Sequence, residues 1–245
     1  MFDAYFGIFP WDRLPKNATG FDLGCGSGRW ASLVAPRVGS LHCIDASMEA
    51  LNVARRNLSA LPTCSFHHAS VDAIPLDDSS MDFGYSLGVL HHIPDPTSGL
   101  RDCVRKLKPG APFLLYLYYA FDNRPGWFRA VWQASDLVRR TASQMPRGLR
   151  FLTSQVLAAT VYWPLARGAR WLERAGLDVS NMPLAAYRER SFYVMRNDAL
   201  DRFGTQLEQR FTRAEISQMM QVAGLDDIRF SERVPFWCAV GIRAR

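Results

Sequence analysis

The stretch that most constrains the fold is residues 21–30, which read Phe-Asp-Leu-Gly-Cys-Gly-Ser-Gly-Arg-Trp. Three glycines, Gly24, Gly26 and Gly28, separate a short apolar run from a helical pattern. Glycine lets a backbone turn sharply and approach a ligand where any side chain would collide. A strand, a glycine turn and the start of a helix, in that order, predict a ligand-binding loop at the end of a strand.

Strand and helix patterns alternate along the first half of the chain. Apolar runs predict strands at 19–23, 41–44, 64–68, 81–87 and 113–119. Helices are expected between them at 28–37, 47–58 and 96–107, the second of them capped by Ser47. This regular alternation predicts an α/β fold with a doubly wound parallel sheet.

The alternation stops after the fifth strand. Residues 120–205 carry helical patterns without a clear pair of strands. The alternation then resumes with a helix at 212–223 and strands at 225–230 and 236–242. We therefore expect residues 1–119 and 206–245 to form one domain. Insertions as long as 120–205 are usually functional, so we expect a helical lid that selects the substrate.

The glycine loop distinguishes between classes of ligand. A dinucleotide loop reads G-x-G-x-x-G, and its third glycine would fall on Arg29. A phosphate-binding loop needs Gly-Lys-Ser/Thr, which this stretch lacks. The loop instead reads Asp22-x-Gly24-x-Gly26-x-Gly28, with an acid ahead of the glycines.

This spacing resembles motif I of the class I S-adenosylmethionine-dependent methyltransferases, in the methyltransferase-11-like branch with quinone, sugar and tRNA-wobble enzymes. The resemblance covers residues 18–119 and 212–243. Asp45, Asp72 with Ala73, residues 86–93 and residues 107–110 match further motifs in the right order. The resemblance implies a Rossmann-like seven-stranded sheet in the order 3-2-1-4-5-7-6 with the last strand antiparallel, a helical insertion after strand five, and S-adenosyl-L-methionine as cofactor.

The resemblance also implies which residues hold this cofactor. Asp22 would orient its ammonium end, Asp45 would accept hydrogen bonds from both ribose hydroxyls, and Asp72 would contact the adenine amino group. The full expected set is Asp22, Gly24, Cys25, Gly26, Gly28, Asp45, Ala46, Met48, Val71, Asp72, Ala73 and Leu87. Taken singly, Asp22 also suits a turn, and Asp45 suits a helix N-terminus.

Methyl transfer needs a base only when the acceptor must lose a proton, and histidine suits that task near neutral pH. His91 and His92 follow the fourth strand, beside the expected methyl site. We favour His92, which aligns with a pocket histidine in related sugar N-methyltransferases. The alternative is that both histidines are structural or contact only the cofactor. Tyr193 is the third catalytic candidate.

Further aromatic and charged residues are candidates for substrate contact. They are Tyr5, Trp11, Tyr118, Tyr119, Arg196 and Asp198. Tyr5 and Trp11 belong to an aromatic N-terminal arm that either packs on the core or closes over a ligand. Arg196 and Asp198 either bind substrate or brace the insertion through salt bridges.

The positive charge of the chain is concentrated in the insertion. The net charge is +6, yet residues 124–174 alone hold nine arginines, no lysine and two acids. Three interpretations remain open: a lid with solvated arginines, a site for an anionic substrate, or an amphipathic surface that rests on a membrane. The most apolar run, 156–166, is too short to span a bilayer. Because the charge is confined to one segment, we do not expect a nucleic-acid partner.

The cysteines and the N-terminus bear on the compartment. The five cysteines include no CxxC pair, so we expect reduced thiols in a cytoplasmic protein and no metal. The first residues lack a secretory pattern. The leading hypothesis is methyl transfer to a small-molecule acceptor, such as a glycan, a lipid-linked or a natural-product intermediate. The alternatives are a tRNA-modifying methyltransferase and a non-catalytic S-adenosylmethionine-binding interaction protein.

Overall fold

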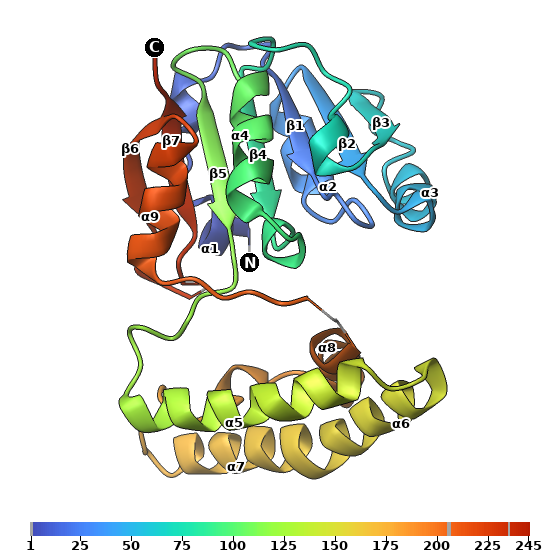
Figure 1. Cartoon of the computed structure of the whole chain (residues 1–245), viewed down its shortest axis with the longest axis vertical. Coiled ribbons are helices and arrows are strands. Elements are labelled where there is room, and N and C mark those ends of the chain that lie inside the picture. Colours follow the sequence, from blue (N-terminus) through green and yellow to red (C-terminus); the bar gives the residue numbers. More distant parts are fainter. Residues whose placement is uncertain (1, 205–206, 235) are drawn as a thin grey trace. The chain divides into compact units, whose positions relative to one another are not determined.

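The computed structural model describes residues 2–204, 207–234 and 236–245. The chain divides into two compact units. The first, which we call the sheet unit, consists of Met1–Ala120 and Gln209–Arg245. The second, the helical unit, consists of Phe121–Glu208. Figure 1 shows the elements of both units.

The described part of the sheet unit contains one sheet of seven strands. They are β1 (Thr19–Leu23), β2 (Ser40–Asp45), β3 (Cys64–His68), β4 (Phe83–Leu87), β5 (Pro112–Tyr116), β6 (Leu225–Phe230) and β7 (Ala239–Arg243). Their order is β3-β2-β1-β4-β5-β7-β6. Strands β1 to β5 pair with one another in parallel, whereas β7 runs antiparallel to β5 and β6. The expected fold class and strand order are confirmed.

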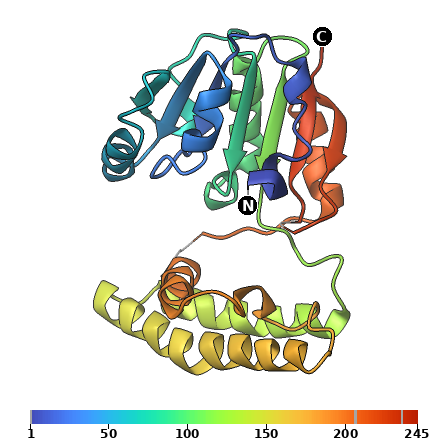
Figure 2. The same cartoon turned by 180° about the vertical axis from the view of Figure 1, so that it is seen from behind.

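Helices cover both faces of this sheet (Figures 1 and 2). They are α1 (Phe2–Phe6), α2 (Ala31–Val34), α3 (Met48–Asn57), α4 (Pro96–Lys106) and α9 (Arg213–Val222). The expected cap is present on α3, where Ser47 Oγ accepts a hydrogen bond from the Ala50 amide at 3.2 Å. Thr212 and Glu215 form a capping box that begins α9.

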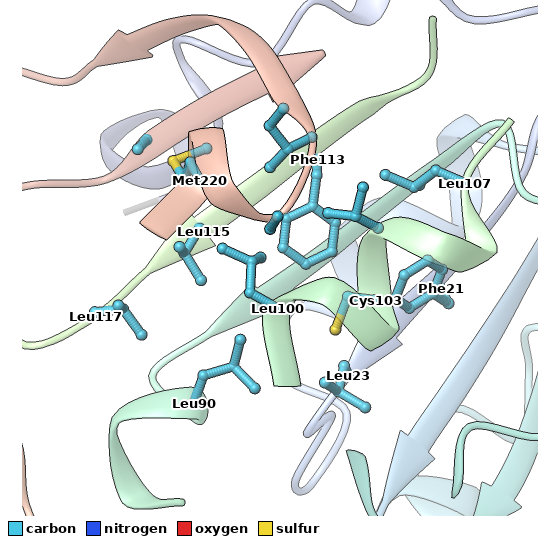
Figure 3. Packing of buried hydrophobic residues seen from close by; sticks show 14 of the residues in the cluster. Phe21, Leu23, Leu90, Leu100, Cys103, Leu107, Phe113, Leu115, Leu117 and Met220 are labelled. Atoms are coloured by element: carbon cyan, nitrogen blue, oxygen red, sulfur yellow. The ribbon is translucent and has the colours of Figure 1, made fainter. Parts of the chain in front are cut away.

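The two faces of the sheet carry separate apolar clusters. Figure 3 shows Phe21, Phe113 and Leu115 with side chains of α4 and α9. On the other face, Tyr85 belongs to a cluster with α2, α3 and Phe6 of the N-terminal arm. Strand β5 is apolar almost throughout because it is covered on both faces. Complete burial of a side chain such as Phe113 contributes about 2–3 kcal/mol.

Several element boundaries differ from those expected. The strand expected at 113–119 ends at Tyr116. Its neighbour β4 ends at Leu87, which pairs with Tyr116, and its other neighbour β7 pairs with it only as far as Leu115. The helix expected at 28–37 is short and continues as a 3-10 turn, Ala35–Arg37. Pro36 lies in this turn, and its missing N–H cannot extend an α-helix.

The helical unit consists of α5 (Gly126–Ser143), α6 (Arg147–Leu157), a π-helical segment (Ala158–Tyr162), α7 (Trp163–Arg174) and α8 (Phe192–Gly204), with a 3-10 turn at Ala185–Tyr187. Helix α8 packs against α5 and α6. The buried Asp136 of α5 pairs with Arg139 at 2.6 Å and with Arg140 at 2.8 Å. In the described residues, none of these or the other helices has the length and apolar character needed to cross a bilayer.

Candidate functional site

The glycine loop after β1 is tied to the end of β2. The amides of Gly24 and Cys25 both donate to the Ile44 carbonyl, at 2.7 and 3.1 Å. The Gly26 amide donates to Oδ2 of Asp45 at 2.8 Å. These bonds place the loop and Asp45 side by side at the carboxyl ends of the parallel strands, where open α/β sheets bind their ligands.

The three glycines of the loop have different roles. All have positive φ, which favours glycine. A Cβ at Gly24 would lie 2.2 Å from Val89 Cγ2, and one at Gly28 would lie 2.7 Å from Leu58 Cδ1. Any side chain at these two positions would therefore collide with a packed neighbour. A Cβ at Gly26 would meet nothing within 4 Å in the described structure. Gly26 is therefore the loop glycine that borders open space.

Asp45 presents its carboxylate beside this loop. Its Oδ1 accepts a hydrogen bond from the Ser47 amide at 2.8 Å, while Oδ2 accepts from Gly26. Each carboxylate oxygen has room for a second donor. Two backbone bonds thus fix the carboxylate and leave it able to accept from a pair of hydroxyls.

Asp22 lies deeper, in the middle of the sheet. Asp22 is 1% exposed, and its Oδ2 has no hydrogen-bond partner among the described atoms. Burial raises the pKa of Asp22 to about 8, the Tyr85 hydroxyl lowers it, and the charge of Asp45 raises it further. A buried carboxyl of this kind suits a cationic ligand group, which would restore its ionised form.

The remaining cofactor candidates lie around the same strand ends. Asp72, on a 3-10 turn (Val71–Ala73) after β3, is exposed, and the Ser70 hydroxyl bonded to it holds its pKa below the ordinary value. Val71 is half-buried against α4, while Ala73 is exposed. A ring nitrogen of His68 lies 3.0 Å from the Ala46 carbonyl oxygen. Cys25 and Leu87 are buried, and Met48 begins α3 with its side chain exposed.

The two histidines occupy different environments in a 3-10 turn (Leu90–His92) after β4. His91 is fully buried, and its ring stacks on Tyr118 with centroids 3.8 Å apart. Burial lowers the pKa of His91 to about 2, with His92 and Arg210 adding to the effect. His91 is therefore neutral near physiological pH. His92 is half-exposed, with its ring centroid 5.8 Å from that of Tyr118.

The segment that enters the sheet unit before α9 lies against this turn. The Gln209 amide donates to the His91 carbonyl, and its side chain donates to the Ile93 carbonyl. The guanidinium of Arg210 lies 5.0 Å from the centre of the Tyr118 ring. Arg210 thus brings a cation to the group formed by His91, His92 and Tyr118.

Tyr119 has a different environment from Tyr118. It forms an isolated bridge with Phe211, and its ring lies 5.5 Å from that of Phe236 at the edge of the apolar cluster under α9. Tyr118 is consequently the member of this pair that lies beside the histidines.

The aromatic N-terminal arm packs on the sheet unit. Tyr5 lies 4.6 Å from Trp30 and 5.2 Å from Tyr116 between ring centroids, and Trp11 lies 4.6 Å from Phe9. Both candidates border the apolar cluster around Phe6 and Phe9. Tyr5 also lies next to the glycine-loop helix through Trp30, whereas Trp11 contacts other residues of the arm.

Three candidates belong to helix α8 of the helical unit. Tyr193 is highly exposed. The Arg196 guanidinium donates to Gln155 Oε1, so this arginine connects α8 to α6. Burial raises the pKa of Tyr162, Arg202 lowers it, and the nearby carboxylate of Asp198 raises it further. Arg196 and Asp198 therefore have interactions within the helical unit.

Sequence reasoning missed two residues of the site. Tyr85 lies directly across from Asp22 in the β1–β4 register, which the strand order and the period of two would have indicated. Arg210 reaches Tyr118 because the Phe211 amide donates to the Tyr118 carbonyl. No motif in the sequence signals that second pairing.

The five cysteines form no disulfide. Cys25, Cys43, Cys64, Cys103 and Cys238 are free. Within the described ranges, no three His, Cys, Asp or Glu side chains are grouped so as to hold a metal ion.

Comparison with known proteins identifies the family of the central segment. Residues 21–115 match the methyltransferase domain family. The chain is 28% identical over 189 residues to ubiquinone biosynthesis O-methyltransferase of Xanthomonas axonopodis pv. citri (strain 306), covering 75% of this chain and 74% of that protein. The enzyme of the same name from Aromatoleum aromaticum is 26% identical over 180 residues, covering 72% and 71%.

A solved structure shares the fold over nearly the full length. It is a SAM-dependent methyltransferase from Methanosarcina mazei, with a TM-score of 0.56, 16% identity and coverage of 97% of this chain and 98% of that one. The family match and the strand order confirm the resemblance expected from the motifs.

Proposed function

We propose that this class I S-adenosylmethionine-dependent methyltransferase binds its cofactor at the carboxyl ends of β1, β2 and β4 and methylates a hydroxyl of a small-molecule acceptor. The observation that carries the proposal is the Asp45 carboxylate, fixed by the Gly26 and Ser47 amides beside the open space at Gly26. When bound, S-adenosylmethionine supplies an electrophilic methyl group on a sulfonium.

The side chains present fit this cofactor. Asp45 would accept from the two ribose hydroxyls, and the buried Asp22, whose Oδ2 has no partner among the described atoms, would balance the ammonium group. Asp72 is exposed and has a lowered pKa, so it would accept from the adenine amino group as an ionised carboxylate. Gly26 gives the cofactor room to approach the loop.

The acceptor side of the site favours a hydroxyl that loses its proton. We assign the base to His92, because His91 is buried with its pKa lowered to about 2. The two relatives are named as O-methyltransferases, which supports an oxygen acceptor. His92 would take the hydroxyl proton as the oxygen attacks the methyl carbon, and the aromatic surroundings of Tyr118 would exclude water.

Arg210 supports an acceptor that carries an acidic group. Its guanidinium lies over Tyr118, beside His91, and a planar guanidinium binds carboxylates and phosphates in a bidentate manner. We assign the further choice of acceptor to the helical unit, which is inserted after β5. Tyr5 and Trp11 of the arm, and Tyr193 of α8, remain candidates for contact with it. Glycans, lipid-linked intermediates and natural-product intermediates all offer such hydroxyls.

Calorimetry tests the cofactor half of the proposal. We expect the full chain to bind S-adenosylmethionine and S-adenosylhomocysteine, and Asp45→Asn to weaken both at least about tenfold because one lost charge-assisted hydrogen bond costs about 1.5–3 kcal/mol. Asp82→Asn is the matched control, since Asp82 also accepts a backbone hydrogen bond, from the Thr19 amide at the start of β1. Binding of neither compound, or equal loss in both variants, would contradict the proposal.

A panel of acceptors tests the other half. Hydroxyl acceptors with and without a nearby carboxylate or phosphate are compared with transfer RNA, using a labelled methyl donor. We expect turnover with acidic small molecules. Methylation of transfer RNA alone would support the nucleic-acid alternative, and cofactor binding without any turnover would support a non-catalytic role.

A further inference from the structure

The helical unit exposes an unusual number of large apolar side chains. Of the 21 large apolar residues that are exposed in the described chain, 17 lie between Trp127 and Leu207 in this unit. Exposed apolar side chains gathered in one part of a molecule mark an interaction surface. The described part of the sheet unit exposes only the other four, and most of its large apolar residues lie in two buried clusters.

The buried core of the helical unit is made mainly of small residues. Its main cluster contains Ala142, Ala158, Ala166 and Ala199 with only a few larger side chains, and its second cluster is smaller still. Trp127, Trp163, Trp171 and the exposed leucines lie outside these clusters. Three of the four tryptophans of the unit are therefore available to a partner, while Tyr162, Met195 and Phe203 form its own core.

The exposed apolar residues follow helical spacing. On α5, Trp127, Val131 and Val138 lie at intervals of four and seven residues, and Leu137 is exposed as well. On α6, Leu149, Leu152 and Val156 recur at intervals of three and four, and Trp163 follows seven residues later at the start of α7. We call the seven residues at these intervals the apolar helical surface. These residues therefore give α5, and the stretch from α6 to the start of α7 (labelled in Figure 1), each a row of exposed apolar side chains.

Arginines accompany the apolar helical surface. Residues 124–174 carry nine arginines against two acids, and both acids are already used: Asp136 pairs with Arg139 and Arg140, and Glu173 pairs with Arg188. Arg129, Arg147 and Arg174 are exposed, and the described structure shows no ion pair for any of them. A net positive charge therefore remains available on the helices that carry the exposed tryptophans and leucines.

We propose that α5 and the helical stretch from α6 to α7 dock on an anionic lipid bilayer. Tryptophan and leucine would enter the boundary between headgroups and acyl chains, while Arg129, Arg147 and Arg174 would pair with lipid phosphates. The attachment is peripheral, in keeping with the finding that no helix in the described residues is built to cross a bilayer. It does not depend on the proposed methyl transfer.

Charge favours a lipid surface over a second copy of the chain. In a two-fold symmetric dimer, the same surface contacts itself, so both copies would bring their unpaired arginines into one interface. Such like charges oppose association, whereas an anionic bilayer attracts them and also covers the apolar side chains.

Vesicle flotation of the full chain tests this proposal. We expect it to float with vesicles of phosphatidylcholine and phosphatidylglycerol, to float much less with phosphatidylcholine alone, and to lose binding as salt is raised. We expect two triple variants each to reduce partitioning at least about tenfold. The first reverses three charges and is Arg129→Glu, Arg147→Glu, Arg174→Glu. The second removes apolar contact and is Trp127→Ser, Leu152→Ser, Trp163→Ser.

Matched variants on the sheet unit are the controls. Lys16→Glu, Arg56→Glu, Arg101→Glu changes net charge equally, and Leu33→Ser, Val222→Ser, Val234→Ser removes equally exposed apolar residues. We expect both control triples to float like the wild type, and all variants to bind S-adenosylmethionine with unchanged affinity.

Three results would overturn the lipid proposal. They are the absence of flotation with anionic vesicles, equal loss in the controls, and a dimer in analytical ultracentrifugation that the Trp127, Leu152 and Trp163 variant dissociates without any vesicle binding. Loss of cofactor binding in the wild type would instead count against the proposed function and leave the flotation result intact.

Discussion

Asp45, the last residue of β2, accepts a hydrogen bond at 2.8 Å from the amide of Gly26, 19 residues earlier in the chain. The bond joins the acid expected to hold the cofactor ribose to the loop expected to approach the cofactor. Since the Ser47 amide holds the other carboxylate oxygen, the loop and the N-terminus of α3 orient Asp45 together.

The open space at Gly26 separates a binding effect from a folding effect. Gly26 and Gly110 both have positive φ, and a Cβ at either would meet nothing within 4 Å of the described chain. We expect Gly26→Ala and Gly110→Ala each to lower the free energy of unfolding by about 1–2 kcal/mol through backbone strain. Only Gly26→Ala should also weaken S-adenosylmethionine binding, at least about tenfold in calorimetry. Equal affinity in the two variants would show that the cofactor does not approach this loop.

The loop and the sheet were accessible from the sequence because local patterns determine them. The glycine spacing, the strand periodicity and the position of Ser47 as a cap all depend on residues close to one another in the chain. The bounds of β1, β3 and β6 agree with those expected. The C-terminal end of β5 was missed because it depends on where β4 and β7 stop, which is non-local information.

Asp22 should make stability fall as pH rises. Its folded pKa, about 8, lies above its ordinary value of 3.8, so the folded state holds the proton more tightly than the unfolded state. The stabilising contribution is complete below about pH 4 and is lost as pH rises to about 8. At pH 9, we expect denaturant titration to give Asp22→Asn a free energy of unfolding higher than that of the wild type by on the order of a few kcal/mol. At pH 4, the two proteins should unfold at the same denaturant concentration.

The same carboxyl links cofactor affinity to pH. A bound ammonium group favours the ionised form of Asp22, so S-adenosylmethionine should bind the wild type more tightly as pH rises toward 8. Asp22→Asn should bind weakly at every pH. The exposed Asp72, whose pKa is lowered, serves as the control: Asp72→Asn should bind S-adenosylmethionine more weakly than wild type but keep the rise in affinity with pH over this range. A wild-type profile that is flat between pH 5 and 9 would refute the prediction.

His91 should make stability fall as pH is lowered, the opposite of the effect of Asp22. Its folded pKa of about 2 lies below the ordinary 6.5, so its contribution is complete above pH 6.5 and is lost as pH falls toward 2. Two pH units below 6.5, we expect the free energy of unfolding of the wild type to have fallen by about 2–3 kcal/mol because of this residue. Denaturation of His91→Phe, which keeps an aromatic ring against Tyr118, should show less acid loss, whereas His68→Gln, at an exposed position, should resemble wild type.

The acceptor side was less accessible from the sequence than the cofactor side. His91 and His92 are neighbours in the chain, and only their burial separates a neutral, enclosed ring from a half-exposed one. Arg210 follows the insertion and reaches Tyr118 through pairing between residues 93 positions apart, which no local pattern signals. The amphipathic helices of the insertion were visible, but not which apolar residues their neighbours leave exposed.

Arg210 should matter for acidic acceptors and not for the cofactor. With an acceptor that carries a carboxylate or phosphate, we expect Arg210→Gln to raise KM about tenfold, because a charge-assisted bidentate contact is lost. Arg210→Lys should recover only part of the loss, since an ammonium cannot form the bidentate pair. Arg213→Gln, at an exposed position on α9, is the control. An unchanged KM in Arg210→Gln, or a matching loss of S-adenosylmethionine affinity, would remove Arg210 from acceptor binding.

His92 is expected to act in the proton transfer. With a hydroxyl acceptor, His92→Ala should keep cofactor affinity and lower kcat about a hundredfold, the usual contribution of a general base. The deficit should shrink as pH rises past the pKa of the acceptor hydroxyl, because an acceptor that is already ionised needs no base. His68→Ala, at the exposed last residue of β3, should leave kcat unchanged. A deficit that stays constant with pH would show that His92 positions the acceptor without taking its proton.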